Sequence, residues 1–245
     1  MDTSLYVNLS YQSSLNRRLE LIANNIANVN TTAFKAERVM FDDALVKAGR
    51  RETVAYVIDR ASYTDFNTGS INQTGNQLDV AVVGDGWLSV ETPDGIRYTR
   101  DGRLSISPNQ ELVALDGSPV LDRGGTRIVI PEQAENIAIA QSGTISVQLQ
   151  GEPIPVEIAQ IGVYDFDAPQ LLNREESGRF SGDVEATLVE TPRVQQFAIE
   201  SANINPIKEI IKLMELSRAY ATAAKSSNDI HEQKKDSIQR LSKNG

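Results

Sequence analysis

Residues 3–29 read TSLYVNLSYQSSLNRRLELIANNIANV. Apolar side chains recur in this stretch at steps of 4, 3, 4 and 3 residues, at Leu15, Leu19, Ile22, Ile26 and Val29. This heptad spacing places one apolar stripe along one side of a helix. The stretch therefore predicts a long N-terminal helix over residues 3–29, with Asp2, Thr3 and Ser4 as capping candidates.

A second long helix is predicted at the other end of the chain. Asn205-Pro206 combines a capping asparagine with a proline at the first helical position, which is a strong start signal. The apolar positions that follow are Ile207, Ile210, Ile211, Leu213, Met214 and Leu216. The pattern runs over residues 206–241, about 35 residues or roughly 50 Å at 1.5 Å per residue, which is about threefold longer than an average helix.

Between these two ends the apolar pattern changes to period two. Strands are predicted at 78–83, 86–90, 96–99, 104–107 and 111–115, separated by short turn signals such as Asp101-Gly102 and Asp116-Gly117. Further strands are expected near 126–130, 136–149, 154–166 and 179–190, whereas 33–75 has no sustained period and looks extended or irregular. The predicted fold class is α+β, with the terminal helices pairing like a coiled coil beside a mainly antiparallel β domain. The expected divisions are 1–32, 33–75, 76–195 and 196–245.

Composition excludes several kinds of site. The chain of 245 residues has no cysteine, which excludes disulfides and thiolate metal sites, and its single histidine, His231, leaves little material for a His-metal centre or a Ser-His-Asp site. His231 sits among charged residues and reads as a solvated helix position. No catalytic residue, cofactor or metal ligand is predicted.

Charge is distributed unevenly along the chain. The net charge is −9, and residues 53–199 hold nine basic and twenty-one acidic residues, so the middle alone carries −12. An acidic middle disfavours nucleic acid as a partner, because phosphate binding needs a basic face. No uncharged run approaches the roughly 18–20 residues of a membrane-spanning helix, so membrane insertion is not expected.

The two apolar stripes need a partner, because an amphipathic helix cannot bury its stripe alone. They could pair within one chain as a hairpin on the β domain of a monomer, or pair between chains in a polymer. A carboxylate enzyme also stays open, since the middle is rich in acids, although no spacing selects a catalytic pair. Gly84-Asp85-Gly86 does not continue as a dinucleotide fingerprint, because a strand follows it instead of a helix.

Three segments carry a resemblance to a known family. Asn24-Asn25-Ile26-Ala27-Asn28-Val29-Asn30-Thr31-Thr32-Ala33-Phe34-Lys35 looks like the N-terminal signature of bacterial flagellar rod and hook proteins, and Ser217-Arg218-Ala219-Tyr220 resembles the family's C-terminal helix motif. Residues 78–87 with 98–102 are similar to the β-domain core of the rod members. The opening Met1-Asp2, Tyr6 and the chain length look more like the proximal than the distal rod members. Ala33 stands where the family usually has glycine, which argues against a positive φ there, and Ser217 where glutamine is usual.

The resemblance implies an axial structural protein without enzymatic activity. Terminal helices from many copies would pack around the channel of the basal-body rod in the periplasm, after export through the flagellar type III apparatus without a cleaved signal peptide. The implied partners are copies of itself and other rod proteins. The expected contact residues are Leu15, Leu19, Ile22, Asn25, Ile26, Asn28, Asn30, Ile207, Ile210, Ile211, Leu213, Met214, Arg218 and Tyr220. Rival interpretations are an enzyme that opens peptidoglycan ahead of the rod and a monomeric secreted binding domain with a helical stalk.

Overall fold

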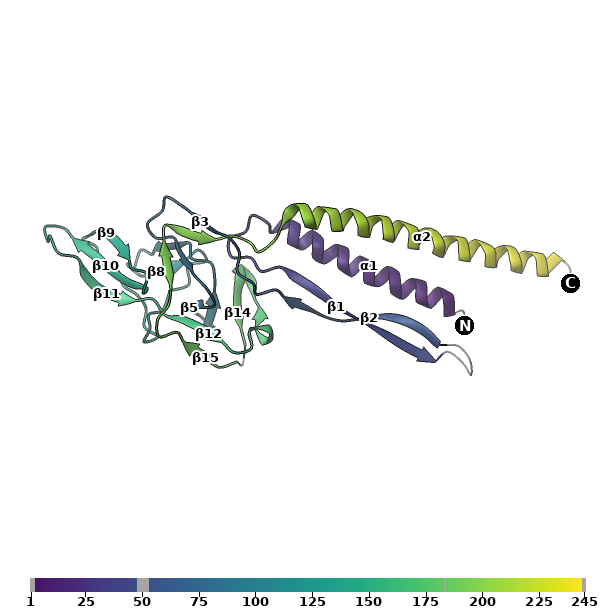
Figure 1. Cartoon of the computed structure of the whole chain (residues 1–245), viewed down its shortest axis with the longest axis horizontal. Coiled ribbons are helices and arrows are strands. Elements are labelled where there is room, and N and C mark those ends of the chain that lie inside the picture. The colour runs from purple at the N-terminus through teal and green to yellow at the C-terminus, as the bar shows by residue number, and fades with distance from the viewer. Residues whose placement is uncertain (1–2, 48–52, 183, 244–245) are drawn as a thin grey trace. The chain divides into compact units, whose positions relative to one another are not determined.

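The computed structural model describes residues 3–47, 53–182 and 184–243, drawn in colour in Figure 1. The chain divides into two compact units. The first, here called the helical unit, comprises Met1–Val29, Ala36–Asp65 and Ile204–Gly245. The second, the β unit, comprises Asn30–Lys35 and Phe66–Asn203. The chain therefore passes from one unit to the other at four places.

The helical unit contains both predicted helices, α1 (Thr3–Ala27) and α2 (Pro206–Lys243). The start of α2 follows its sequence signal, since Asn205 Oδ1 accepts a hydrogen bond from the Lys208 amide at 3.1 Å. At the end of α1, Asn28 Nδ2 donates to the Asn24 carbonyl at 2.9 Å. The predicted helices are confirmed to within two residues at each end, and the capping candidate Asp2 lies outside the described residues.

A long β-hairpin completes the helical unit and lies in 33–75, where the sequence indicated an extended or irregular segment and no paired strands were predicted. Strand β1 (Glu37–Lys47) pairs antiparallel with β2 (Thr53–Thr64), from Glu37 opposite Thr64 to Lys47 opposite Thr53. One irregularity in the register falls between Met40 and Phe41. A two-stranded hairpin alone is marginally stable, and this one also contacts α1, so its order comes from partners that a local sequence pattern does not reveal.

The β unit is built from short antiparallel strands. Its largest sheet has the order β13-β14-β6-β5-β12-β15, formed by Asn173–Arg174, Arg179–Ser181, Gly95–Thr99, Trp87–Thr92, Val163–Phe166 and Ala186–Leu188. A second sheet has the order β11-β10-β9, formed by Val156–Gln160, Thr144–Leu149 and Ala134–Ile139. Three pairs complete it: β16 (Val194–Gln196) with β4 (Val80–Val82), β17 (Ala198–Glu200) with β3 (Ile71–Gln73), and β7 (Leu104–Ile106) with β8 (Leu112–Ala114). Short 3-10 turns lie at Pro169–Leu171 and Glu176–Gly178.

The predicted strands of the early middle are confirmed as β4, β5, β6, β7 and β8. The longer expected regions each resolve into two strands: 136–149 into β9 and β10, 154–166 into β11 and β12, and 179–190 into β14 and β15. The strand expected near 126–130 is wrong. That segment makes only isolated bridges, Arg127 with Leu121 and Val129 with Glu111, because each neighbour runs beside it for a single residue.

Two cores hold the β unit together. The larger is aliphatic and includes Val80, Leu88, Val90, Leu112, Val120, Ile128, Ile145 and Ile161. The smaller is aromatic, with Trp87 in edge-to-face contact with Phe180 at 4.9 Å and Phe66 at 5.5 Å between ring centroids. The acidic middle of the chain can therefore bury an apolar core of its own.

Ala33 adopts the left-handed conformation that its identity argued against, with φ of 57°. The strain of this conformation is about 1–2 kcal/mol for a non-glycine residue. Tertiary contacts offset it, since Ala33 is buried and its amide donates to the Glu200 carbonyl at 2.8 Å. The expectation drawn from the missing glycine is therefore wrong.

Candidate interaction site on the terminal helices

Helices α1 and α2 lie side by side in the helical unit, with the start of α1 and the end of α2 toward the same end (Figure 1). They run antiparallel. Gln12 Nε2 reaches across and donates to the Ala223 carbonyl at 3.0 Å. At the other end of the pair, Asn25 of α1 and Glu209 of α2 line one cavity. The two terminal helices of one chain therefore contact each other within the helical unit.

The face of α2 that points toward α1 contains small and mixed side chains. Glu209 and Ala223 are buried, while Leu213, Leu216 and Ala219 are half-buried. The steps between these positions are three and four residues, as expected for one helix face. Alanine at 219 and 223 allows the two helix backbones to approach closely.

The most apolar face of α2 lies on the opposite side of the helix and is exposed. Ile207 is 70% exposed, Met214 50%, and Ile210 and Ile211 46% each. We call these four residues the isoleucine face. This face does not pack on α1 of the same chain, because at 100° per residue it points about 180° away from Glu209, Leu216 and Ala223.

Helix α1 is covered on more than one side. Leu15 is buried, and Leu19, Ile22, Ile26 and Val29 are half-buried, in agreement with the predicted stripe. Leu21 is also buried, although it lies off that stripe. It lines a cavity with Val39 and Tyr63 of the hairpin, so the hairpin covers a second face that a one-stripe pattern does not reveal.

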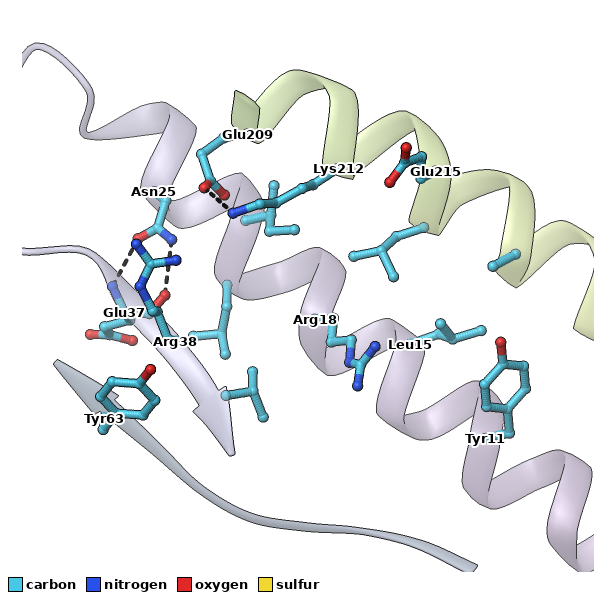
Figure 2. Close-up of a pocket in the computed structure, with 15 residues that line it drawn as sticks. Tyr11, Leu15, Arg18, Asn25, Glu37, Arg38, Tyr63, Glu209, Lys212 and Glu215 are labelled. Atoms are coloured by element: carbon cyan, nitrogen blue, oxygen red, sulfur yellow. Dashed lines mark hydrogen bonds and ion pairs between the residues drawn. The ribbon is translucent and has the colours of Figure 1, made fainter. Parts of the chain in front are cut away.

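Asn25 joins α1 to the hairpin. Its Nδ2 donates to the Glu37 carbonyl at 2.9 Å, and its Oδ1 accepts from the Glu37 amide at 3.0 Å (Figure 2). The amide thus pairs with the first residue of β1 in the way that a neighbouring strand would. Asn28 bonds within its own helix, and Asn30 is exposed. The side chains of Asn25 and Asn28 thus both bond to backbone groups of the same chain.

A cavity of about 560 Å³ lies between α1, α2 and the hairpin. One charged pair in it is shown in Figure 2, where the Glu209 carboxylate accepts from Lys212 Nζ at 2.7 Å. Arg38 Nε donates to Asp65 at 2.8 Å, and this bond raises the pKa of the Arg38 guanidinium further above its usual value. Each of these two pairs neutralises its own charges.

The remaining predicted contact residues lie apart from this cavity. Arg218 is exposed near the isoleucine face, and Tyr220 is 37% exposed at the edge nearer α1. His231 and Ser217 are exposed on α2. Within residues 3–47, 53–182 and 184–243, no three His, Cys, Asp or Glu side chains gather where they could hold a metal ion. Neither described helix combines the length and apolarity needed to cross a membrane.

Three segments of the chain match protein families. Residues 5–35 match the flagella basal body rod protein family, and residues 81–147 match the D1 domain of the flagellar hook proteins FlgE/F/G. Residues 195–239 match the C-terminal segment of the flagellar basal body rod FlgEFG proteins. The first and last of these segments contain most of α1 and α2.

Individual proteins match over nearly the whole chain. The flagellar basal-body rod protein FlgF of Caulobacter vibrioides is 33% identical, with 99% of each chain covered. FlgF of Mesorhizobium japonicum is 36% identical, with 91% of each chain covered. The flagellar basal-body rod protein FlgG of Buchnera aphidicola is 29% identical, covering 93% of this chain and 95% of its own.

Proposed function

The chain belongs to the family of flagellar basal-body rod proteins, and we propose that it polymerises into the rod through the isoleucine face of α2. Members of this family are structural subunits, so the chain is a structural protein of the flagellar basal body and not an enzyme. It assembles with copies of itself and with other rod proteins. The peptidoglycan-opening activity considered from the sequence is therefore dropped.

The observation that carries the proposal is the exposure of Ile207, Ile210, Ile211 and Met214 in a chain whose α1–α2 pair is already made. Contiguous exposed apolar side chains on a soluble unit mark an interaction surface. Burial of such side chains contributes about 25 cal/mol per Å² of apolar area removed from water. A neighbouring subunit supplies that burial, and α1 does not compete for the face because it covers the opposite side of α2.

The helical unit accordingly serves as the assembly domain. Antiparallel α1 and α2 form one elongated element, and many copies of it pack around a central channel as a coiled-coil-like layer. Contacts that repeat head to tail without closing a ring generate an open helical polymer, which is the geometry of a shaft. The remaining predicted contact residues, including Arg218 and Asn30, border this layer.

We further propose that the protein occupies the proximal part of the rod in the periplasm and reaches it through the type III export apparatus. The proximal position is favoured by its opening residues and by its resemblance to proteins named FlgF. A distal position remains the second candidate, because proteins named FlgG also match nearly the whole chain.

The test replaces one residue of the isoleucine face with a charge. Met214→Glu places a carboxylate where a neighbour would pack, and Ser226→Glu is the matched control at an exposed position of α2 about 120° around the helix from Met214. We expect both purified chains to keep wild-type helicity, while only Met214→Glu is missing from isolated basal bodies and abolishes motility. Normal incorporation of Met214→Glu would refute the proposal.

A further inference from the structure

The β unit contains a buried lysine, Lys35, that lies outside the isoleucine face. The side chain of Lys35 has no exposed surface, and its Nζ donates to Glu200 Oε1 at 2.8 Å. It also donates to the carbonyl of Asn67 at 2.9 Å and lies 3.4 Å from that of Phe66. A buried ammonium is stable only when charge and hydrogen-bond partners replace its lost hydration. This one site supplies both.

The groups that Lys35 joins belong to three segments at chain crossings between the two units. Lys35 is the last residue before the second crossing, Phe66 is the first residue after the third, and Glu200 lies three residues before the fourth, which follows Asn203. The three segments are 31–165 residues apart in sequence. One ammonium group therefore joins the residues near three crossings. At these the chain leaves the β unit for β1, enters it again after β2, and leaves it for α2.

Backbone contacts reinforce the same junction. The Ala33 amide donates to the Glu200 carbonyl at 2.8 Å, and the Gly69 amide donates to Glu200 Oε1 at 2.7 Å. Gly69 is packed so closely that a Cβ on it would lie 1.9 Å from the Ser201 carbonyl oxygen. The junction thus depends on a specific close approach of two backbones as well as on the ion pair.

The second oxygen of Glu200 connects the junction to the β unit. Glu200 Oε2 lies 3.5 Å from Arg100 Nε, and Arg100 is itself 3% exposed. Arg100 Nη2 donates to the Gly84 carbonyl at 2.7 Å, and its guanidinium stacks 5.5 Å from the Trp87 ring centroid. The carboxylate of Glu200 is therefore shared between the crossing segments and the core around Trp87.

We propose that Lys35, Glu200 and Arg100 form a clamp that fastens the three crossing segments to each other and to the β unit, so that the segments open together and never singly. Lys35 and Glu200 are positioning residues in this device, and neither belongs to the isoleucine face. The inference is independent of how the protein polymerises. It concerns how the ends of the chain are tied to its middle.

The test is residue-level amide hydrogen exchange on the full-length chain. Lys35→Met removes the ammonium, Glu200→Gln removes the charge but keeps an oxygen, and Gly69→Ala disturbs the close approach without changing any charge. Arg127→Gln is the control, because it breaks an exposed ion pair with Glu91 in the same unit. The reporters are the amides of Ala33, Gly69 and Asn203 in the junction, and those of Leu112 and Ile161 in the core.

In the unchanged protein, the three junction amides should exchange with one common opening rate. In Lys35→Met, Glu200→Gln and Gly69→Ala, we expect exchange of the junction amides to accelerate at least tenfold while that of Leu112 and Ile161 stays within twofold. The control, Arg127→Gln, should change the exchange of neither group. Acceleration of the core amides by the same factor, or unfolding of all three variants, would overturn the clamp, since the cluster would then support the whole β unit. Exchange of the junction amides within twofold of the unchanged protein would overturn it as well.

Discussion

Gln12 Nε2 donates a hydrogen bond to the carbonyl oxygen of Ala223 at 3.0 Å, joining residues 211 positions apart. The acceptor is a backbone carbonyl within α2, so the bond uses a lone pair that the helical ladder leaves available. This contact favours the observed register of α1 along α2. The antiparallel pair is thus specified by a polar contact as well as by its apolar residues.

Ala223→Leu should weaken the helix pair. Ala223 is 6% exposed beneath α1, and a larger side chain forces the two backbones apart at a cost of about 1–3 kcal/mol. The matched control is Ala221→Leu, because Ala221 is exposed on the same helix. The measurement is thermal unfolding followed by circular dichroism at 222 nm, where both helices dominate. Equal melting temperatures for the two variants would contradict the assigned α1–α2 interface.

Leu15→Ala should destabilise the helical unit by about 2–5 kcal/mol, since Leu15 is 2% exposed and truncation leaves a cavity. Leu9→Ala is the control, because Leu9 is 60% exposed on the same helix and should change stability by less than about 0.5 kcal/mol. Urea unfolding monitored at 222 nm measures both. A Leu9 effect as large as that of Leu15 would mean that α1 presents a different face to α2.

Local signals in the sequence were sufficient to predict the helices and most strands. The heptad steps from Leu15 and the helix start at Asn205-Pro206 are local signals, each contained within a short stretch of sequence. They can therefore be recognised without knowledge of the tertiary fold. The hairpin at Glu37–Thr64 was missed because its ordering comes from pairing between two strands. The burial of Leu21 was missed for a related reason, since the covering hairpin had not been predicted.

For the candidate interaction site, less could be predicted from the sequence than for the fold. Apolar content marks both faces of α2 as packing surfaces but does not say which partner each face meets. The face with Ala219 and Ala223 turns toward α1, and the richer face around Ile210 stays exposed, because close helix approach favours small side chains. Lys35 and Glu200 were missed entirely, because no local pattern relates two charges 165 residues apart.

Gln196→Ala should destabilise the β unit by about 2 kcal/mol, because it leaves backbone groups without their partner. Gln196 Nε2 donates to the carbonyls of Gln77 at 2.7 Å and Ile137 at 2.9 Å, and its Oε1 accepts from the Ile139 amide at 3.0 Å. Gln195→Ala, at the preceding position of β16, is the control. Urea unfolding followed by Trp87 fluorescence reports on this unit. Similar midpoints for both variants would show that these bonds contribute nothing net.

The β unit should lose stability at alkaline pH through Tyr98. Burial, and then the neighbouring Tyr164, raise the pKa of Tyr98 above its usual 10.0, because both disfavour the phenolate. The contribution of the neutral phenol is therefore complete below the unfolded pKa of about 10 and is lost as pH rises through the folded value. Tyr98→Phe should reduce the loss in free energy of unfolding between about pH 8 and about pH 11. An undiminished loss would assign the alkaline sensitivity to other groups.

Deleting residues 2–29 should leave α2 unable to order along its inner face, although residues 70–200 stay folded. Without α1, the side chains of Glu209, Leu216 and Ala223 face water, and an isolated helix rarely persists when its packing partner is removed. Trp87 belongs to the aromatic core of the β unit, so its fluorescence should keep a wild-type emission maximum and urea midpoint. Amide exchange over 206–230 should approach the unprotected rate.

In cells, the deletion fused to a secretion segment should be exported but absent from purified basal bodies, because the isoleucine face then lacks a rigid helix to present it. Normal incorporation of the truncated chain would show that α2 assembles without α1, and the helix pair would have to be abandoned as the assembly element.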